Sequence, residues 1–258
     1  MSDCLLTERN GAIATLTFNR PEALNALDVP MAQAFLAAMR AIASDTSVRA
    51  VVLKGAGRAF IAGGDLATLR ANPTQGMRDL LVPLNEAVLL MHGLDAPVIA
   101  QVHGASAGGG LSLMLMCDFV IAAEGTKFNL AYINLGTNCD VGGSWALPRL
   151  VGLRHALEIA LLGENLDSAE GLRLGLVNRV VPIAELQAAV DAFAARIASG
   201  PTKAYGTMRR LMRAGFDNDL ATQLQAEAES FEACTRTADL REGLEAFFER
   251  RKPLFHGR

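Results

Sequence analysis

Residues 103–110 read His-Gly-Ala-Ser-Ala-Gly-Gly-Gly and directly follow the apolar run Pro97–Val102. The run predicts a buried strand, and the glycines predict a tight turn that opens an apolar helix ending near Cys117. Glycine permits positive φ angles and lets a ligand approach the main chain closely. The first N–H groups of a helix have no partner within it, and the positive end of the helix dipole lies behind them. This turn is therefore a candidate site for binding negative charge.

A second glycine-rich segment, Gly55–Leu66, follows another predicted strand, Val48–Leu53. It reads Gly-Ala-Gly-Arg-Ala-Phe-Ile-Ala-Gly-Gly-Asp-Leu. If the two turns converge, they offer two backbone N–H donors to one developing oxyanion. Losing one such donor typically costs about 3 kcal/mol in the transition state. The simpler alternative is that each segment is only a tight turn.

Two other interpretations compete for the first turn. Gly104–Gly108 matches a Gly-x-Ser-x-Gly nucleophile elbow with Ser106 as nucleophile, and His155 and His256 follow in the order a hydrolase triad needs. The HGGG-type donor segment that accompanies such elbows is missing from the sequence. A dinucleotide-binding turn is the other possibility, but Gly-x-Gly-x-x-Gly is not met in register at the first strand. The residues by themselves leave these hypotheses and the oxyanion pair open.

The order of the predicted elements indicates an α/β fold. Asp28, with Pro30 two residues later, is a plausible start for a helix that runs to about Ala43. The first half alternates strands with helices, and the second half is mostly helical. We expect a core over residues 1–198 and a helical C-terminal region over residues 199–258. Strands are predicted at Ile13–Phe18, Val48–Leu53, Pro97–Val102, Phe119–Ala123 and Leu176–Val181, and helices at Met77–Met91, Gly143–Leu150, Leu153–Leu162, Ser168–Leu174, Ile183–Ala198, Pro201–Arg213 and on to Arg251.

Composition narrows the class of function. Of the 258 residues, 51% are hydrophobic and 20% are charged, which suits a globular enzyme with some apolar surface covered by a partner subunit. A net charge of −3 argues against nucleic acid as a partner. The four cysteines are scattered, without the spacing of a disulfide framework or a metal site. Residues 1–8 show no secretory signal, and no stretch has the length of a membrane span, so we expect a cytoplasmic location.

Further motifs extend over the whole chain. They are Asn19–Leu27, Ala59–Leu66, Gly104–Gly110, Cys117–Asp118, Leu147–Gly152, Ala169–Val177 and Glu242–Lys252. With these segments in this order, the chain resembles the crotonase, or enoyl-CoA hydratase/isomerase, superfamily. Within it, Asp140, Gly142–Gly152 and Gly200–Ala204 are most similar to the phenylacetate-type isomerases that use one aspartate.

The resemblance implies a crotonase-like spiral of ββα units with a helical C-terminal trimerisation region. It also implies homotrimers or hexamers built as dimers of trimers, an acyl-CoA thioester as substrate, and no cofactor beyond the substrate's CoA moiety. The oxyanion N–H groups would belong to Ala62 and Gly109. Asp65 is included among the binding residues, although its type also fits a role at a turn or helix end, as does that of Asp118. The residues that would bind the substrate are Ala23, Leu24, Gly63, Gly64, Asp65, Leu66, Ser112, Tyr132, Phe247 and Arg250.

The choice of reaction is narrowed by the absence of two acidic residues that hydratases of the family use. Hydratases of the family hold and activate water with two glutamates, and the corresponding positions here are Ser112 and Tyr132. Neither has an ordinary pKa suited to replacing a carboxylate near neutral pH. Efficient hydration is therefore not expected, and Tyr132 is expected to shape or stack on the acyl group. The resemblance also implies that Ser106 is a small packing residue, which disfavours the hydrolase interpretation.

Asp140 is the carboxylate left near the predicted site. Its residue type also fits a helix cap or a solvated loop. In the single-aspartate subgroup an acid at this position moves a proton, and flanking Leu135, Val141 and Trp145 could form an apolar wall that raises its pKa. The usual Ile-Gly-Leu-Val-Pro-Asp is replaced by Asn134–Asp140, Asn-Leu-Gly-Thr-Asn-Cys-Asp, which could adapt the pocket to another acyl group.

We therefore expect an enoyl-CoA isomerase. The N–H groups of Ala62 and Gly109 would bind the thioester carbonyl, while Asp140 would remove a proton and return it two carbons along. The alternatives are an enoyl-CoA hydratase, another crotonase activity such as a thioester hydrolase or a dehalogenase with Asp140 as nucleophile, and a non-catalytic acyl-CoA-binding scaffold.

Overall fold

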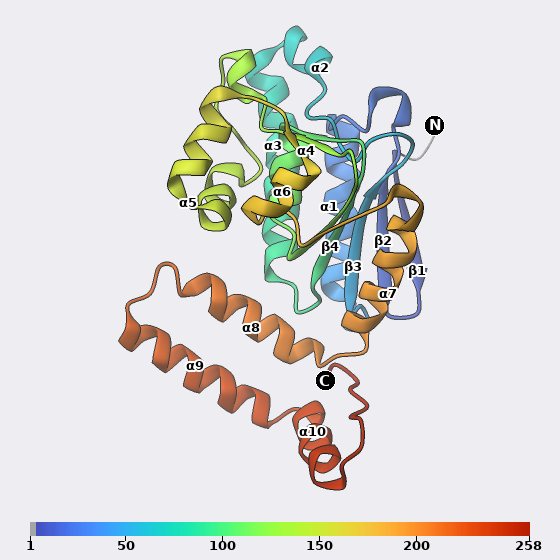
Figure 1. The fold of residues 1–258 in the computed structure, drawn as a ribbon, viewed down its shortest axis with the longest axis vertical. Coiled ribbons are helices and arrows are strands. Elements are labelled where there is room, and N and C mark those ends of the chain that lie inside the picture. Colours follow the sequence, from blue (N-terminus) through green and yellow to red (C-terminus); the bar gives the residue numbers. More distant parts are fainter. Residues whose placement is uncertain (1–3) are drawn as a thin grey trace.

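A computed structural model describes residues 4–258; the first three residues of the N-terminal stretch considered above lie outside this part. A six-stranded sheet forms the centre, in the order β1-β2-β3-β4-β6-β9 (Figure 1). Every neighbouring pair in it is parallel except β1 and β2. Its strands are β1 (Leu5–Asn10), β2 (Ile13–Phe18), β3 (Ala50–Gly55), β4 (Val98–Val102), β6 (Phe119–Ala123) and β9 (Arg179–Val181).

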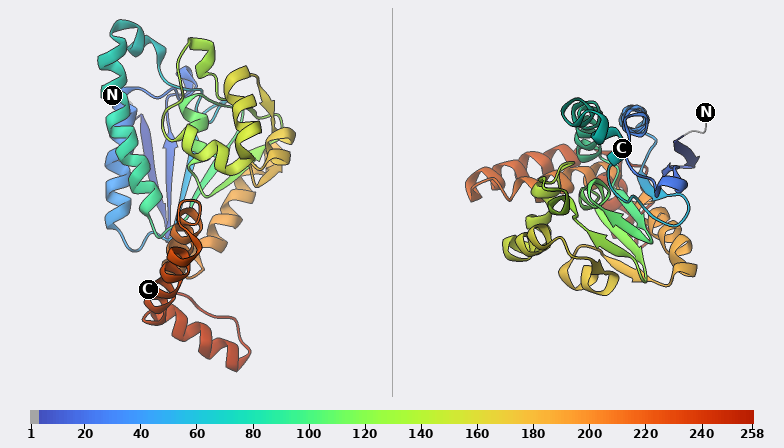
Figure 2. Two further views of the ribbon diagram at one scale, coloured as in Figure 1. Left: turned by 90° about the vertical axis from the view of Figure 1, so that its left-hand side faces the viewer. Right: turned by 90° about the horizontal axis from the view of Figure 1, so that it is seen from above.

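Helices cover both faces of this sheet. On one face lie α1 (Val29–Ser44) and α3 (Pro73–Gly93), and on the other lies α7 (Leu186–Ala198) (Figure 2). Alternate side chains of β3 enter the two layers, with Val51 and Leu53 on the first face and Ala50 and Val52 on the second. Parallel strands buried on both faces read as continuous apolar runs, which is why this part of the fold was visible in the sequence.

A small second sheet supplies the short strands of the ββα units. It consists of β5 (Ala105–Ala107), β7 (Lys127–Asn129) and β8 (Leu166–Asp167), and Ile61 extends it through a parallel bridge to Ser106. Two of the long strands, β4 and β6, therefore each lead into a short strand and then a helix. Thus β4 and β5 precede α4 (Gly109–Leu115), and β6 and β7 precede η2 (Tyr132–Leu135) and α5 (Gly143–Leu162). This is the ββα succession that the resemblance implied.

The C-terminal helices extend away from the core (Figures 1 and 2). They are α8 (Thr202–Ala214), α9 (Leu220–Thr235) and α10 (Ala238–Glu249). Asp118 holds α8 to the core: its carboxylate lies 2.6 Å from Arg209 Nε and 2.8 Å from Arg213 Nη2, and it accepts the Val98 N–H. The structural role expected of Asp118 is confirmed. Among residues 4–258, no helix has both the length and the apolar character needed to cross a bilayer.

Most of the predicted helices and strands are present. The structure differs from the prediction mainly where the sequence pattern is short or weak. Asp28 caps α1 by accepting the Met31 N–H, and α6 (Ser168–Leu174) has its predicted bounds. The exposed edge strand β1, the short α2 (Leu66–Ala71) and the strands of the small sheet were not predicted, since two to six residues carry little periodicity. The last predicted helical stretch is broken into α9 and α10 at residues 236–237. Gly152 (φ 76°) kinks α5 at the gap between the two helices predicted for this segment. The remaining short turns are η1 (Pro21–Ala23) and η3 (Ile183–Glu185).

Gly110 marks where the helix of the first glycine turn meets the second turn. A Cβ added at Gly110 would lie 2.2 Å from the Ile61 carbonyl oxygen. We expect Gly110→Ala to reduce the free energy of unfolding by about 3 kcal/mol, since backbone must shift to relieve the overlap. Urea unfolding followed by circular dichroism measures this. Gly93→Ala is the matched control, because no atom from outside its own stretch of helix lies within 4 Å of its added Cβ. Equal losses in both variants would contradict the explanation.

Candidate active site

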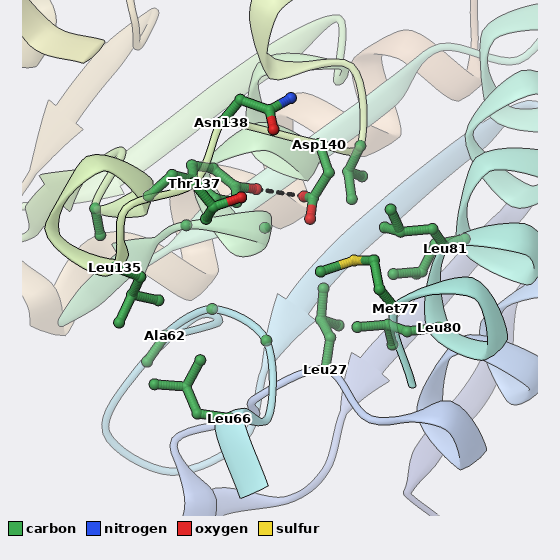
Figure 3. A pocket seen from close by; sticks show the side chains of 18 of the residues that line it. Leu27, Ala62, Leu66, Met77, Leu80, Leu81, Leu135, Thr137, Asn138 and Asp140 are labelled. Carbon is green, nitrogen blue, oxygen red and sulfur yellow. Dashed lines mark hydrogen bonds between the residues drawn. The ribbon is translucent and has the colours of Figure 1, made fainter. Parts of the chain in front are cut away.

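A cavity of about 280 Å³ lies between the two glycine turns, the first half of α3 and the segment 131–141 (Figure 3). Its wall is mostly apolar, and Asp140 is the one carboxylate among the described residues that line it. The lining residues are Leu27, Ala62, Gly63, Gly64, Leu66, Met77, Leu80, Leu81, Leu84, Gly108, Gly109, Ala131, Tyr132, Asn134, Leu135, Thr137, Asn138, Asp140 and Val141.

The two glycine turns touch at this cavity. The Ala107 N–H donates to the Ile61 carbonyl at 2.9 Å, and a Cβ on Gly108 would lie 3.5 Å from the Cα of Gly63. Gly108 has φ +49° and Gly63 has φ +116°, conformations that favour glycine. The expected convergence of the two turns is therefore confirmed.

The donors differ in one respect from the expectation. Gly109 is the first residue of α4, and within residues 4–258 its N–H has no acceptor. The Ala62 N–H, however, donates to the Leu24 carbonyl at 3.0 Å, so the expectation that Ala62 offers a free oxyanion donor is wrong. The reason is tertiary: Leu24, with φ 51°, turns its carbonyl toward Ala62.

Gly64 is the better candidate for the second donor. It forms a parallel bridge with Leu27, in which the hydrogen bonds come from its neighbours: Leu27 N–H donates to Gly63, and Asp65 N–H donates to Leu27. The N–H of Gly64 itself therefore points away from Leu27, and it has no acceptor in the described part of the chain. The signal in the sequence, a pair of glycines before Asp65, did not say which N–H would remain free.

Asp140 faces the donor side of the cavity. It precedes α5 in a tight turn, where Val141 (φ 51°) and Gly142 (φ 84°) both have left-handed backbone. A Cβ added at Gly109 would lie 3.6 Å from Asp140 Oδ1, so the carboxylate and the start of α4 are neighbours. Burial raises the pKa of Asp140, and a hydrogen bond from Tyr132 opposes part of that rise. A raised carboxyl pKa is typical of a general base in an apolar site.

Tyr132 was expected to shape the acyl pocket, and the structure gives it an additional contact. Its hydroxyl donates a hydrogen bond to Asp140 Oδ1 and lies 3.1 Å from the Oγ of fully buried Ser112. Burial and the neighbouring Asp140 charge raise the pKa of Tyr132, so its phenol is neutral. The three side chains therefore form one hydrogen-bonded group.

The other predicted residues divide into two groups. Gly63, Gly64 and Leu66 line the cavity as expected. The Asp65 side chain instead lies 3.0 Å from Arg20 Nη2 and caps α2 through the Ala67 N–H.

The remaining predicted contacts lie outside the cavity wall. Ala23 and Leu24 lie beside the second turn and do not line the cavity. Trp145 is not part of the apolar wall, because its ring packs against His92 and Arg149. Phe247 and Arg250 belong to the end of α10, at the opposite end of the molecule from α2 (Figure 1). The structure thus does not bring them to the cavity of the same chain.

Sequence reasoning missed the wall formed by α3. Met77, Leu80 and Leu81 face Asp140 across the cavity, together with Leu27 (Figure 3), and Leu84 also lines the cavity. Their spacing of i, i+3, i+4 and i+7 predicts an apolar helix face. It does not distinguish a face that packs in the core from one that lines a cavity.

A ββα spiral that brings two glycine turns and one acid to an apolar cavity defines this chain as a protein of the crotonase fold. Its residues 8–258 match the model of the enoyl-CoA hydratase/isomerase family. The chain is 38% identical over 254 residues to a protein named probable enoyl-CoA hydratase from Rhodobacter capsulatus, covering 97% of each. It is 35% identical over 262 residues to the 1,2-epoxyphenylacetyl-CoA isomerase of Escherichia coli, covering 100% of each.

Solved structures agree with this assignment. The enoyl-CoA hydratase of Bacillus anthracis superimposes with a TM-score of 0.94 at 31% identity, over 99% of this chain and 100% of that one. The chain therefore belongs to the enoyl-CoA hydratase/isomerase family, and the predicted crotonase fold is confirmed.

Proposed function

We propose that this enzyme is an enoyl-CoA isomerase that moves a carbon–carbon double bond in an acyl-CoA thioester. The observation that carries the proposal is the single carboxylate: Asp140 is the one acid among the described residues lining the cavity, and it lies beside Gly109. One base serves to remove a proton and return it elsewhere on the same substrate.

The reaction follows from the positions of these groups. The N–H groups of Gly64 and Gly109 bind the thioester oxygen, and the dipole of α4 adds to the stabilisation of negative charge there. This acidifies the carbon next to the carbonyl. Asp140 takes its proton, the double bond moves into conjugation as the enolate forms, and the proton returns at the carbon two positions further along. The apolar residues of α3 and Leu135 hold the acyl chain and exclude water.

Hydration is the competing function, because most of the named relatives are hydratases. The two positions at which the resemblance places the glutamates of hydratases are occupied by Ser112 and Tyr132, and both hydroxyls are engaged in the group that includes Asp140. Neither supplies a second carboxylate to activate water. The present arrangement thus favours isomerisation.

Purified enzyme with a 3-enoyl-CoA, a 2-enoyl-CoA and a phenylacetate-derived ring-epoxide thioester tests this proposal. Ultraviolet absorbance follows conjugation, and mass spectrometry detects added water. We expect isomerisation of at least one thioester without a mass gain. Water addition by the wild-type enzyme would contradict the isomerase, and binding without turnover would favour a non-catalytic scaffold.

The pH dependence of isomerisation has a definite sign. Asp140 acts as a base only when it is ionised, and burial raises its pKa. We therefore expect kcat/KM to fall as the pH decreases through this raised pKa, at a higher pH than for an exposed aspartate. Initial rates over a pH series at low substrate concentration measure it. A rate that stays constant down to the ordinary range of an aspartate would contradict the assignment.

We also propose that the enzyme acts in the cytoplasm as a homotrimer or hexamer, and needs no cofactor beyond the CoA of its substrate. Exposed large apolar side chains of the C-terminal helical region support the assembly, among them Met212, Phe216, Leu224, Phe231 and Phe248. Light scattering after size-exclusion chromatography tests it.

A further inference from the structure

The hydrogen-bonded group around Asp140 comes from three separate elements. Ser112 is on α4, Tyr132 begins η2, and Asp140 precedes α5. The start of η2 is itself held in place: Ala131 has φ 54°, and its N–H donates to the Asn129 side chain at 2.6 Å. The Tyr132 ring is therefore presented to Asp140 by a constrained backbone.

The direction of these hydrogen bonds follows from the chemistry of the groups. An ionised carboxylate only accepts, and a neutral phenol has one hydrogen to donate. Since the Tyr132 hydrogen goes to Asp140 Oδ1, the phenol oxygen is left as the acceptor for the Ser112 hydroxyl. The Ser112 hydroxyl thus donates to Tyr132, and the Tyr132 hydroxyl donates to Asp140.

This direction distinguishes the two oxygens of Asp140. Oδ1 is occupied by the Tyr132 hydrogen, while the other carboxylate oxygen points into the open cavity, on the side of Leu27 and Met77 (Figure 3). A proton taken up on Oδ2 leaves the bond from Tyr132 intact, because Oδ1 still accepts. A proton on Oδ1 would oppose the Tyr132 hydrogen and require both hydroxyls to reverse.

We propose that Tyr132 is the positioning residue of Asp140, holding Oδ1 so that Oδ2 takes up and returns the substrate proton. Ser112 orients the Tyr132 hydroxyl in turn. The kinetic consequences of this inference rest on the proposed isomerase function. The coupling between Tyr132 and Asp140 is independent of that function.

Among the described residues that line the cavity, no charged side chain competes with the Tyr132 hydroxyl for Asp140. The side chains that line the cavity from α3 are apolar, those from the segment 131–138 other than Tyr132 are apolar or uncharged polar, and the glycine turns contribute backbone. The adjacent Cys139 is half-buried and packs toward the core. The hydrogen bond from Tyr132 lowers the pKa of Asp140 and is thus the main effect that opposes the rise caused by burial.

Tyr132→Phe removes the hydroxyl and keeps the ring. We expect kcat to fall about 10- to 100-fold, the usual worth of a hydrogen bond to a charged group, with KM nearly unchanged. The acid limb of kcat/KM should also move to higher pH, since burial then acts on Asp140 without the opposing bond. Ser112→Ala should also lower kcat and move the acid limb to higher pH, but both effects should be smaller. Tyr205→Phe, the same change at the other tyrosine, on α8, is the matched control and should leave both unchanged.

A second measurement separates this inference from the proposed function. Carboxyl carbon NMR of protein labelled at aspartate follows the titration of Asp140 without substrate, the Asp140→Asn spectrum assigning its signal. The expected result is a titration of Asp140 at higher pH in Tyr132→Phe than in wild type and Tyr205→Phe. An unchanged titration would overturn the coupling whatever the activity, and a rise in KM with kcat retained would assign Tyr132 to acyl binding instead. If the titration shifts as expected in Tyr132→Phe but the wild-type protein has no isomerase activity, the coupling is supported and the proposed function is contradicted.

Discussion

Asp140→Asn is expected to lower kcat for double-bond isomerisation by about 10²- to 10⁴-fold, the range typical of a lost general base. Asparagine has nearly the same shape, and its carbonyl oxygen still accepts the Tyr132 hydrogen, so the cavity should keep its form. The amide, however, does not take up a proton from carbon near neutral pH. Steady-state kinetics with the best 3-enoyl-CoA substrate measure the loss, and KM should change little.

The matched control for this variant is Asp191→Asn. Asp191 is an exposed acid on α7 that accepts a hydrogen bond from Gln187, far from the lining residues of the cavity. It should retain wild-type activity, and both variants should retain wild-type circular dichroism. Full turnover by Asp140→Asn would remove the base from the proposed mechanism, and with it the main support for an isomerase.

Gly109→Ala is expected to reduce kcat/KM about 100-fold, because its methyl group would enter the space between the N–H donor and the base. The added Cβ would lie 3.4 Å from Leu27 Cδ1, 3.6 Å from Asp140 Oδ1 and 3.7 Å from the Tyr132 hydroxyl. A displacement of the reacting atoms by about 1 Å costs on the order of 100-fold in rate. The same assay on the same substrate measures it.

The fold should tolerate this change. The contacts of the added methyl are close to ordinary van der Waals distances, the φ angle of Gly109 is not in the left-handed region, and alanine favours a helix over glycine. Gly110→Ala, one residue later, is the informative comparison, because there the methyl meets backbone rather than the cavity. Wild-type activity in Gly109→Ala would mean that the thioester does not bind between Gly109 and Asp140, whereas a large loss of stability would mean that α4 itself had shifted.

Much of the fold could be predicted because its signals are local. The strands Ile13–Phe18 and Phe119–Ala123 match β2 and β6 in full, since a strand buried on both faces reads as an apolar or β-branched run. The helix start at Asp28 was equally visible, because the cap needs only a side-chain oxygen and the N–H three residues later. The small sheet was not visible, because its two- and three-residue strands are stabilised by partners far along the chain.

The sequence by itself determined the chemical inventory of the site: two glycine turns after strands, one aspartate, and no pair of glutamates at Ser112 and Tyr132. Only the tertiary structure decided how these groups are used. It assigned the Ala62 N–H to Leu24, pointed to Gly64 as the free donor, and joined Tyr132 to Asp140. The physical reason is that residue type sets which hydrogen bonds a group is able to form, whereas the partner it receives depends on directions and distances that exist only after distant segments have packed together.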